Sequence, residues 1–405
     1  MAIRYTHLRA MIPLFLAVFM DSLGNGIIFP ILTPLIYSPN GILPIDATAL
    51  YRAMLYGVML GLFALGMFFS TPILGEMSDR IGRKKILLFC LGGISISYVL
   101  AVMAVITSTV SFLVVSRLIA GLCAGSVATA QAAIIDVSPP EQKTKYLSLL
   151  LFPSSLGFAA GPMCGSFLAN SHLVSWFTYW TPLAFAAVLA IGNVILLGFA
   201  FKETFLRNGS IKLNLSSAIY LFSDAFSDNK IRHLSIVYLL FQLSWGSYFQ
   251  YISLFMFRRF DYDAIHLGYF MTFIATSFAF TYLYLIPLLT QYFQRMPLLR
   301  YSLGFNMLSI SIVMLAPHPL WVWVGTFLNA LSNGLAYSVI LSLFSDTVGS
   351  DKQGWIMGVT AAVNALSFAI TAIIIGILNI FSLYLPLYIA TIAVAWAVWL
   401  SQRLR

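Results

Sequence analysis

Hydrophobic runs about as long as a bilayer is thick recur along the whole chain, with short polar segments between them. A helix needs about 20 apolar residues to cross a membrane, whereas a strand of a transmembrane β-barrel shows about ten residues of alternating polarity. The runs here are unbroken, as in LSLLLFPSSLGFAAGPMCGSFLA, so they predict helices. We predict twelve transmembrane helices, at residues 11–36, 53–74, 86–107, 111–134, 145–169, 178–201, 234–256, 265–289, 299–316, 320–345, 355–379 and 382–401.

The longest polar stretch, residues 202–233, lies in the middle of this pattern. It is the only segment between spans with room for helices on the membrane surface, and it leaves six spans on each side. We therefore predict an all-α membrane protein with an N-terminal half at 1–201, a cytoplasmic linker at 202–233 and a C-terminal half at 234–405.

A faint internal repeat relates the two halves. DVSPPEQK follows the fourth span, and DTVGSDKQ follows the tenth span at the corresponding place. The loops after the second and eighth spans share a basic residue, Arg83 in GEMSDRIGRKK and Arg295 in PLLTQYFQRMP. Two six-helix halves related by an axis normal to the membrane are typical of one large class of transporters.

Composition and charge agree with this pattern and give it an orientation. Hydrophobic residues make up 60% of the chain and charged residues only 9%, against about 25% charged residues in soluble proteins. If the amino terminus is cytoplasmic, all but four of the 22 Lys and Arg residues fall on cytoplasmic segments. The exceptions are Arg52, Arg258 and Arg259 outside and Arg117 within a span, which follows the positive-inside rule and predicts two cytoplasmic termini. The basic residues are scattered, so the net charge of +9 does not indicate nucleic-acid binding.

Residues that could carry covalent or metal chemistry are sparse. Cys90, Cys123 and Cys164 lie in separate apolar spans, which excludes a disulfide framework and a CxxC metal site and indicates packing residues. No GxxxxGK[ST] phosphate-binding motif is present, so ATP is not expected to drive the protein. Asp21 interrupts the first apolar stretch, which shows no cleavage site and is interpreted as the first span. We predict no enzyme activity, no metal and no cofactor.

The loop after the second span, GEMSDRIGRKK, has the form G-x-x-x-D-R-x-G-R-K and resembles the corresponding loop of the major facilitator superfamily. The resemblance implies that Asp79 faces the start of span eleven, near Gly354 and Trp355, where backbone N–H groups favour an anion. It also implies that Arg83 pairs with Asp136 at the end of span four. We name the implied set the cytoplasmic latch, made of Gly75, Asp79, Arg80, Gly82, Arg83, Lys84 and Asp136. The alternative is an ordinary positive-inside loop.

Two ionisable residues lie well inside predicted spans. Asp21 is the only such acid, and burying a carboxylate at mid-membrane costs at least about 2.5–3.5 kcal/mol. Its segment, DSLGNGIIFP, is similar to the D-x-x-G-x-G-x-x-x-P segment of the twelve-helix drug/proton antiporters, the tetracycline-efflux-like branch. Arg117 lies in SRLIAGLCAG, which resembles the family's R-x-x-x-G segment except at Ala120, where Gln is usual. We predict proton coupling by Asp21 and Arg117, with purely structural roles as the alternative.

The fifth span reads LGFAAGPMCGS and resembles the family's G-x-x-x-G-P-x-x-G-G antiporter segment, with Ser166 in place of the last Gly. Gly157, Gly161 and Gly165 repeat every four residues and predict a smooth face for close helix packing. Pro162 predicts a kink that can serve as a hinge. Ordinary small-residue packing is the alternative to an antiporter role.

The resemblance implies a central cavity lined by spans 1, 4, 7 and 10. The amide and aromatic residues there, with one from span 11, suit an amphiphilic solute, although each residue alone is more often a helix–helix hydrogen bond than a ligand contact. These candidates are Asn25, Gln131, Gln242, Trp245, Tyr248, Gln250, Asn329, Asn333, Tyr337 and Asn364. Spans 3 and 9 hold no acidic residue where tetracycline exporters carry one, which argues against tetracycline as the substrate.

Together these features predict a proton-coupled secondary transporter that works by alternating access, preferably an antiporter exporting a small amphiphilic organic solute or drug. The main alternative is a proton-coupled importer of a nutrient or a siderophore-like metal chelate. A membrane enzyme and a non-transporting receptor are less consistent with the motifs. We expect a monomer in the bacterial inner membrane, with the lipid bilayer and a small molecule as its partners and the proton gradient as its energy source.

Overall fold

The computed structural model describes residues 2–39, 41–137, 143–203, 217–228, 231–347 and 353–404. Within these ranges the chain is helical, with short connections and no strand. Every predicted span coincides with one helix or with successive helices, which confirms the all-α fold class. Eight helices of the described ranges are long and apolar enough to cross a membrane.

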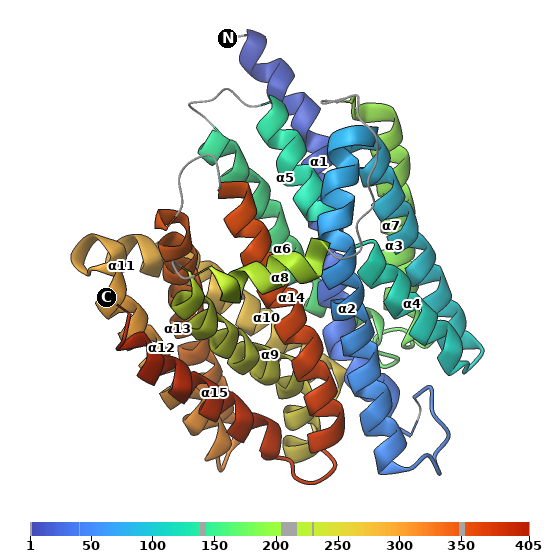
Figure 1. Ribbon diagram of the computed structural model, residues 1–405. Helices are drawn as coiled ribbons and strands as arrows, with labels where there is room; N and C mark the ends of the chain where they lie inside the picture. The colour runs from blue at the N-terminus through green and yellow to red at the C-terminus, as the bar shows by residue number, and fades with distance from the viewer. Residues whose placement is uncertain are drawn as a thin grey trace. The chain divides into compact units, whose positions relative to one another are not determined.

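The chain forms two compact units. Unit 1 comprises Met1–Asp46, Leu65–Leu215 and Asp263–Thr272. Its helices are α1 (Ala2–Tyr37), the second part of α2 (Ala49–Ile81), α3 (Arg83–Ile106), α4 (Val110–Leu122), α5 (Ser126–Val137), α6 (Lys143–Leu168), α7 (Trp180–Ala200) and the first part of α10 (Ala264–Phe280) (Figure 1).

Unit 2 comprises Ala47–Ala64, Ser216–Tyr262 and Phe273–Arg405. Besides the remaining parts of α2 and α10, it contains α8 (Ser217–Ser227), α9 (Arg232–Phe260), α11 (Ile286–Tyr292), α12 (Arg295–Met314), α13 (Pro319–Asp346), α14 (Gln353–Leu378) and α15 (Leu385–Ser401). Most of each unit comes from one predicted half, while 47–64 and 263–272 group with the other half. The predicted halves therefore remain a proposal.

Two predicted spans are not single helices. Span four is broken between α4 and α5, where Cys123, Ala124 and Gly125 connect them. A Cβ on Gly125 would lie 2.6 Å from a Leu74 methyl carbon, so α2 closely approaches this break. Span eight contains a π-helical turn at Thr281–Leu285, and such turns recur at functional sites. The hydrophobic pattern continues through both breaks and so could not predict them.

α1 and α6 pack side by side in unit 1 (Figure 1). A Cβ on Gly157 would lie 2.3 Å from the Phe19 carbonyl oxygen, and one on Gly161 would lie 2.5 Å from the Leu23 carbonyl oxygen. The backbones can approach this closely only because the side chains are absent. Gly26 of α1 makes the contact reciprocal, since its Cβ would lie 2.9 Å from Pro162 Cδ.

The same face of α6 continues to Gly165 and Ser166. A Cβ on Gly165 would lie 2.7 Å from the carbonyl oxygen of Ile27 on α1. Ser166 instead faces α10, where a Cβ on Gly268 would lie 1.9 Å from the serine hydroxyl oxygen. The serine that departs from the family segment is thus matched by a glycine on the neighbouring helix.

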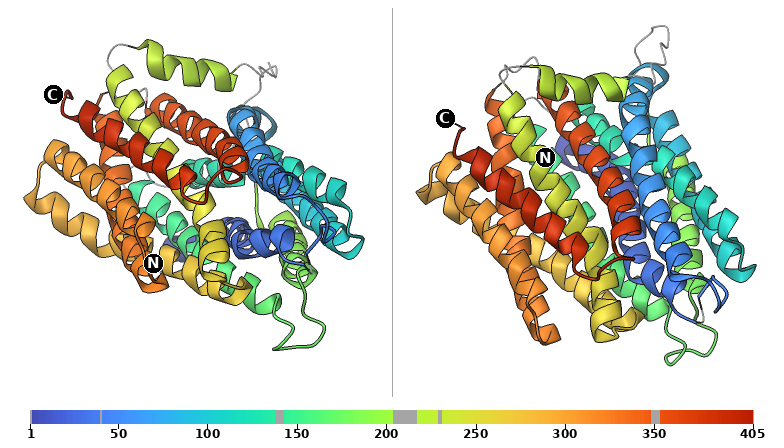
Figure 2. Two further views of the ribbon diagram at one scale, coloured as in Figure 1. Left: turned by 90° about the horizontal axis from the view of Figure 1, so that it is seen from below. Right: turned by 60° about the horizontal axis from the view of Figure 1, so that its bottom comes forward.

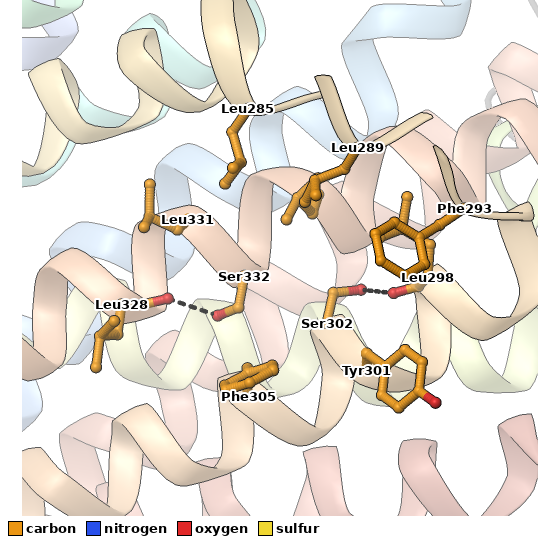
Figure 3. A pocket seen from close by; sticks show the side chains of 11 residues that line it. Leu285, Leu289, Phe293, Leu298, Tyr301, Ser302, Phe305, Leu328, Leu331 and Ser332 are labelled. Carbon is orange, nitrogen blue, oxygen red and sulfur yellow. Dashed lines mark hydrogen bonds between the residues drawn. The ribbon is translucent and has the colours of Figure 1, made fainter. Parts of the chain in front are cut away.

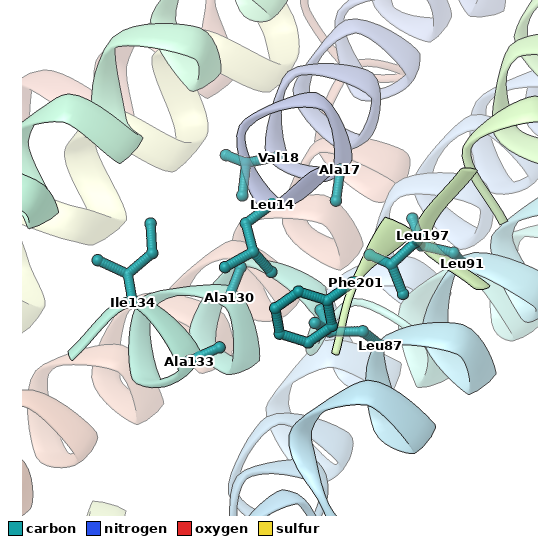
Figure 4. Close-up of a cluster of buried hydrophobic side chains, with 10 residues drawn as sticks. All are labelled: Leu14, Ala17, Val18, Leu87, Leu91, Ala130, Ala133, Ile134, Leu197 and Phe201. Carbon is teal, nitrogen blue, oxygen red and sulfur yellow. The ribbon is translucent and has the colours of Figure 1, made fainter. Parts of the chain in front are cut away.

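An apolar cluster joins α1, α3, α5 and α7 next to this contact (Figure 4). Its members are Leu14, Ala17, Val18, Leu87, Leu91, Ala130, Ala133, Ile134, Leu197 and Phe201. The small alanines allow the helices to approach, while the leucines and Phe201 fill the space between them, as dense interior packing requires. The cluster fixes the first part of α1 in unit 1.

Unit 2 is built around α9, which packs against α14 and α15, while α12 packs against α13 and α15 (Figure 2). A Cβ on Gly57 of α2 would lie 2.8 Å from the α-carbon of Gly376, so α2 and α14 also meet through glycines. Tyr56 donates a 2.8 Å hydrogen bond to the Gln250 carbonyl oxygen. Glycine contacts and buried hydrogen bonds thus hold the first part of α2 in unit 2.

An apolar cavity of about 310 Å³ lies between α11, α12 and α13 (Figure 3). Leu289, Phe305 and Leu331 are among its lining residues. The hydroxyls of Ser302 and Ser332 also line it, but they donate hydrogen bonds to carbonyl oxygens of their own helices. α11 contributes no buried residue, so the cavity provides apolar contact at the edge of unit 2 and lacks the free polar groups of a solute site.

The α1–α6 contact predicts that Gly161→Leu destabilises the protein, by about 1–3 kcal/mol or more, because the added atoms force two backbones apart. Gly92→Leu is the matched control, since a Cβ on Gly92 of α3 meets no described atom within 4 Å. The melting temperatures of both variants in detergent should be compared with that of the unmodified protein. Equal melting temperatures for the two variants would show that the glycine face is not a close-packed contact.

Candidate functional site

The loop between α2 and α3 depends on Gly82. Its φ angle is +114°, a region that side-chain-bearing residues rarely adopt. A Cβ there would also lie 2.3 Å from a carboxylate oxygen of Glu203. Gly82 is therefore required both by the backbone turn and by the residue packed against it.

Arg83, the first residue of α3, is buried and bonded to several acceptors. Its Nε donates to Asp136 Oδ2 at 3.0 Å, and its Nη1 lies 2.5 Å from Asp79 Oδ1. Ser78 also accepts a hydrogen bond from Nη1. Charge-assisted bonds of this kind are stronger than neutral ones, so Arg83 fastens the end of α2 to the end of α5.

Glu203 completes this corner and was not predicted from the sequence. Its carboxylate accepts hydrogen bonds from the backbone N–H groups of Arg83, at 2.7 Å, and Lys84, at 3.2 Å. It therefore occupies the amino terminus of α3, where the helix dipole favours negative charge. The Lys84 ammonium donates to the Gly198 carbonyl oxygen at 2.7 Å, which ties α3 to α7 as well. The only sequence signal was an acid directly after span six.

Two further members of the cytoplasmic latch lie apart from this corner. Arg80 pairs with Glu76 one turn earlier on α2, at 2.6 Å. Gly75 lies inside α2, and a Cβ there meets no described atom within 4 Å, so packing within unit 1 does not explain this glycine. The predicted contact of Asp79 with the start of α14 would join the two units and remains a prediction.

Unit 2 contains a counterpart of the Arg83–Asp136 pair. Arg295, the first residue of α12, forms an ion pair with Asp346 at the end of α13. These are the two residues that the internal repeat aligns with Arg83 and Asp136. Most of the repeated DVSPPEQK and DTVGSDKQ segments lies outside the described residues. In each unit, the repeated residues thus join the start of one helix, α3 or α12, to the end of another, α5 or α13.

Asp21 and Arg117 are both buried in unit 1, with 9% and 5% of their surface exposed. No ion pair among the described residues joins them. Ser126 on α5 is a polar neighbour of the Asp21 carboxyl. The Nε and Nη2 atoms of Arg117 are buried without a hydrogen-bond partner in the described part of the chain.

Tyr98 on α3 is a third member of this site that sequence reasoning missed. It is buried, with 6% of its surface exposed. Its hydroxyl lies against α1, because a Cβ on Gly24 would be 2.0 Å from the hydroxyl oxygen. A single tyrosine in an apolar span carries no distinguishing sequence signal, but the first glycine of DSLGNG marks a close neighbour.

Several predicted cavity residues of unit 2 are used in bonds between helices. The bonds join Tyr248 Oη with Thr326 Oγ1 at 2.7 Å, Gln250 Nε2 with Thr371 Oγ1 at 2.9 Å, and Asn329 Nδ2 with Ser309 Oγ at 3.1 Å. Because these bonds fix the side chains, fewer of their polar atoms are left for a solute.

Gln242 differs from these residues, because both of its amide atoms are buried without a hydrogen-bond partner among the described residues. Asn333 Nδ2, Gln250 Oε1 and Asn329 Oδ1 are likewise buried without a partner there. Buried amides are normally paired, so these unpartnered atoms are candidates for contact with a bound molecule. In unit 1, Asn25 and Gln131 are partly buried.

Unit 2 also contains a group of aromatic side chains around Trp245, which lies three residues after Gln242 on α9. The Trp245 ring lies 5.0 Å from the Phe249 ring and 5.2 Å from the Phe278 ring. The Tyr337 ring lies 6.5 Å from that of Tyr238. Asn364 is a polar neighbour of Tyr238, a residue that was not among the predicted candidates. Tyr238 lies four residues before Gln242 on α9, and this spacing on one helix face could have identified it.

No three His, Cys, Asp or Glu side chains of the described ranges gather as ligands of a metal would. Long apolar helices with buried ionisable groups in the spans are those of a polytopic membrane protein. The chain matches the model of the Major Facilitator Superfamily over residues 14–372 and belongs to that family of transporters. It is therefore a transporter and not an enzyme.

Similar proteins support this assignment. The class H tetracycline resistance protein of Pasteurella multocida is 25% identical over 379 residues, covering 89% of this chain and 88% of that protein. Multidrug resistance protein 1 of Bacillus subtilis (strain 168) is 27% identical over 381 residues, covering 93% and 91%. The crystal structure of the human organic anion transporter MFSD10 (TETRAN) covers 98% of this chain and 99% of its own, with a TM-score of 0.72 and 19% identity, and so shares the fold.

The bonds that Arg83 makes with Asp136 and Asp79 generate a prediction for a double-mutant cycle. Arg83→Ala and Asp136→Ala should each lower the melting temperature, and their effects should be non-additive by more than about 0.5 kcal/mol, because the pair is bonded and Arg83 is buried. The half-buried Arg80–Glu76 pair, one turn apart on α2, is the control, with an expected coupling of about 0.3–0.5 kcal/mol. A coupling for Arg83–Asp136 no larger than that of the control would show that the corner does not depend on this pair.

Proposed function

We propose that the protein is a proton-driven secondary transporter that works by alternating access and exports a small amphiphilic organic solute in exchange for protons. The observation that carries this proposal is the buried carboxyl of Asp21, which has no ion-pair partner among the described residues. Ionisable groups inside transmembrane segments are costly and commonly serve as proton relays.

Asp21 is suited to carry the proton because of where it lies. It is on α1 between the glycine contact with α6 and the apolar cluster, so a movement of these helices changes what surrounds its carboxyl. In the proposed cycle Asp21 binds a proton when the site opens to one side and releases it on the other. Solute and proton are coupled if each favours a different state of the same site, since a ligand shifts an equilibrium only by its differential affinity.

The residues of unit 2 support an amphiphilic, largely uncharged contact surface for the solute. The free amide of Gln242, the amide of Asn333 and the ring of Trp245 offer hydrogen bonds and flat apolar contact. The predicted spans of this unit hold no carboxylate. Such a wall orients an organic molecule by a few polar groups. Relatives named for tetracycline, multidrug and organic anion transport agree with an organic solute.

The cytoplasmic latch is proposed to hold the cytoplasmic side closed in one state of the cycle. Its supporting observation is the density of charge-assisted bonds around Arg83, repeated as Arg295 with Asp346. We retain the positive-inside orientation, with both termini in the cytoplasm, a bacterial inner-membrane location and a monomeric state as parts of the proposal. Rocking of two six-helix halves, 1–201 and 234–405, is the movement it implies.

Import of a nutrient or metal chelate would use the same two buried ionisable residues. Direction is therefore tested separately from coupling. A thermal-shift screen against antibiotics, amino acids, organic acids and siderophores would supply a binding solute, because a ligand of the folded state raises stability by mass action. Loss of that solute from preloaded proteoliposomes under an imposed proton gradient would establish export, whereas its accumulation along with proton entry would establish import.

Replacement of Asp21 should separate coupling from binding. Asp21→Asn keeps the size and a hydrogen-bonding capacity but cannot titrate, so gradient-driven transport of the screened solute should fall to background while the protein folds and exchanges solute downhill. Asp263→Asn is the control, since Asp263 is an exposed acid just before α10. Solute flux in proteoliposomes with and without a pH gradient measures both.

Uphill transport by Asp21→Asn at the rate of the control would contradict the proposal. The coupling group would then have to be sought elsewhere, and Asp21 would be a structural carboxyl.

A further inference from the structure

The cavity between α11, α12 and α13 has walls that suit a hydrocarbon chain. Besides two serines, whose hydroxyls donate to carbonyl oxygens of their own helices, and the ring of Tyr301, its lining consists of leucine and phenylalanine side chains (Figure 3). A single water needs roughly 10–15 Å³ of such space and two or more polar partners. At about 310 Å³ the cavity is too large and too apolar for isolated waters, and an apolar ligand fits it better.

The cavity remains open because α11 does not close against its neighbours. The π-helical turn at Thr281–Leu285 ends at a lining residue, and α11, which follows directly, contributes no buried residue. α12 packs against α13 instead. The lining rings of Phe293, Tyr301 and Phe305 are 48%, 62% and 59% exposed. Tyr301 and Phe305 belong to the predicted span 299–316, so this side of the cavity is reached from the lipid phase.

The lining of α12 begins close to a charged helix end. Arg295 is the first residue of α12, and the lining residues Leu298, Ser302 and Phe305 follow along one stripe of the helix. At 1.5 Å per residue, these three lie about 5–15 Å along the axis from Arg295. One leaflet of a hydrocarbon core about 30 Å thick is roughly 15 Å deep. The stripe therefore spans the depth that an acyl chain occupies when its headgroup lies at Arg295.

This helix end carries an excess of positive charge. From Arg295 onward the described residues include three arginines and one acid, Asp346. Arg300 donates to the Leu404 carbonyl oxygen at 2.9 Å, which brings the end of the chain with Arg403 to α12. The Arg295 side chain is 52% exposed, and its ion pair with Asp346 engages Nη1 alone. A guanidinium has five N–H donors, so exposed donors of Arg295 remain for an anion.

We propose that this cavity is a binding site for an anionic phospholipid, with one acyl chain between α11, α12 and α13 and the phosphate at Arg295. The headgroup complements the excess of arginines, while the chain fills the apolar space that α11 leaves open. The transported solute is a poorer occupant, because the serine hydroxyls of the lining are already bonded. The site lies within unit 2 and does not include Asp21, so the inference is independent of proton coupling.

Native mass spectrometry of the purified full-length protein tests the headgroup. Dioleoyl phosphatidylglycerol should bind roughly fivefold more tightly than dioleoyl phosphatidylcholine, which has the same chains and no net charge. Arg295→Gln should remove this preference. Arg259→Gln is the control and should keep it, since Arg259 is an exposed arginine in the last turn of α9. Glycerol phosphate carries the charge without the chains and should not displace the lipid.

Photo-crosslinking tests the position of the acyl chain. Phosphatidylglycerol with a diazirine in one chain should label the peptides of α11, α12 and α13 that line the cavity. Leu289→Trp fills the cavity from α11, whose lack of buried residues leaves room for the change, and should abolish this label. Leu288→Trp is the matched control, because Leu288 is 52% exposed and lies outside the lining. The label should persist in this control.

Each measurement can overturn the inference. Absence of label from these peptides in the unmodified protein would do so even if Leu289→Trp failed to fold, and so would equal label in Leu289→Trp and Leu288→Trp. A preference for phosphatidylglycerol that survives Arg295→Gln would show that the phosphate is not bound there.

Other occupants would be recognised in the same experiments. Displacement of the lipid by an equal concentration of glycerol phosphate would assign the site to a free anion, and protection from label by the solute of the thermal-shift screen would assign it to that solute. Either result contradicts the lipid site. Loss of the headgroup preference in Arg295→Gln, together with loss of label in Leu289→Trp alone, supports it.

Discussion

The cost of placing ionisable groups in a low-dielectric interior is the constraint on which this molecule depends. Asp21 and Arg117 lie inside predicted spans and are 9% and 5% exposed, so a charge on either group is costly. A protein that only needed stability would replace them by apolar side chains, since buried ion pairs often contribute nothing net. Their presence, unpaired with each other, is explained if the site must change its charge state or its partners during a transport cycle.

Close helix packing supplies the geometry that this site needs. Gly157, Gly161 and Gly165 let α6 lie against α1, while Gly24 and Gly26 on α1 receive the Tyr98 hydroxyl and Pro162. Each glycine of DSLGNG therefore has a separate neighbour that excludes a side chain. Next to Asp21, α1 is therefore in close contact with Tyr98 of α3 and with α6, and a shift of either neighbour changes the surroundings of the carboxyl.

The fold was predictable because hydrophobic length and the polar linker are global features of the chain. The breaks in spans four and eight were not, since Cys123–Gly125 and Thr281–Leu285 keep the apolar pattern while the backbone geometry changes. The loop motif drew attention to Arg83 and Asp136, which the structure joins at 3.0 Å. Glu203 and Tyr98 could not be found, because each meets its partners across a long sequence separation. The amides of unit 2 were identified, but the sequence could not show that Gln250 is bonded to another helix while both amide atoms of Gln242 are unpartnered.

The central claim is that solute and proton compete through Asp21, and reciprocity makes this measurable at equilibrium. The purified protein, in weak buffer with a pH indicator, should release protons when it binds the solute found by the thermal-shift screen. The Asp21→Asn variant should bind the same solute without releasing protons. Proton release of equal size from Asp21→Asn, or solute binding with no release from the unmodified protein, would contradict the account.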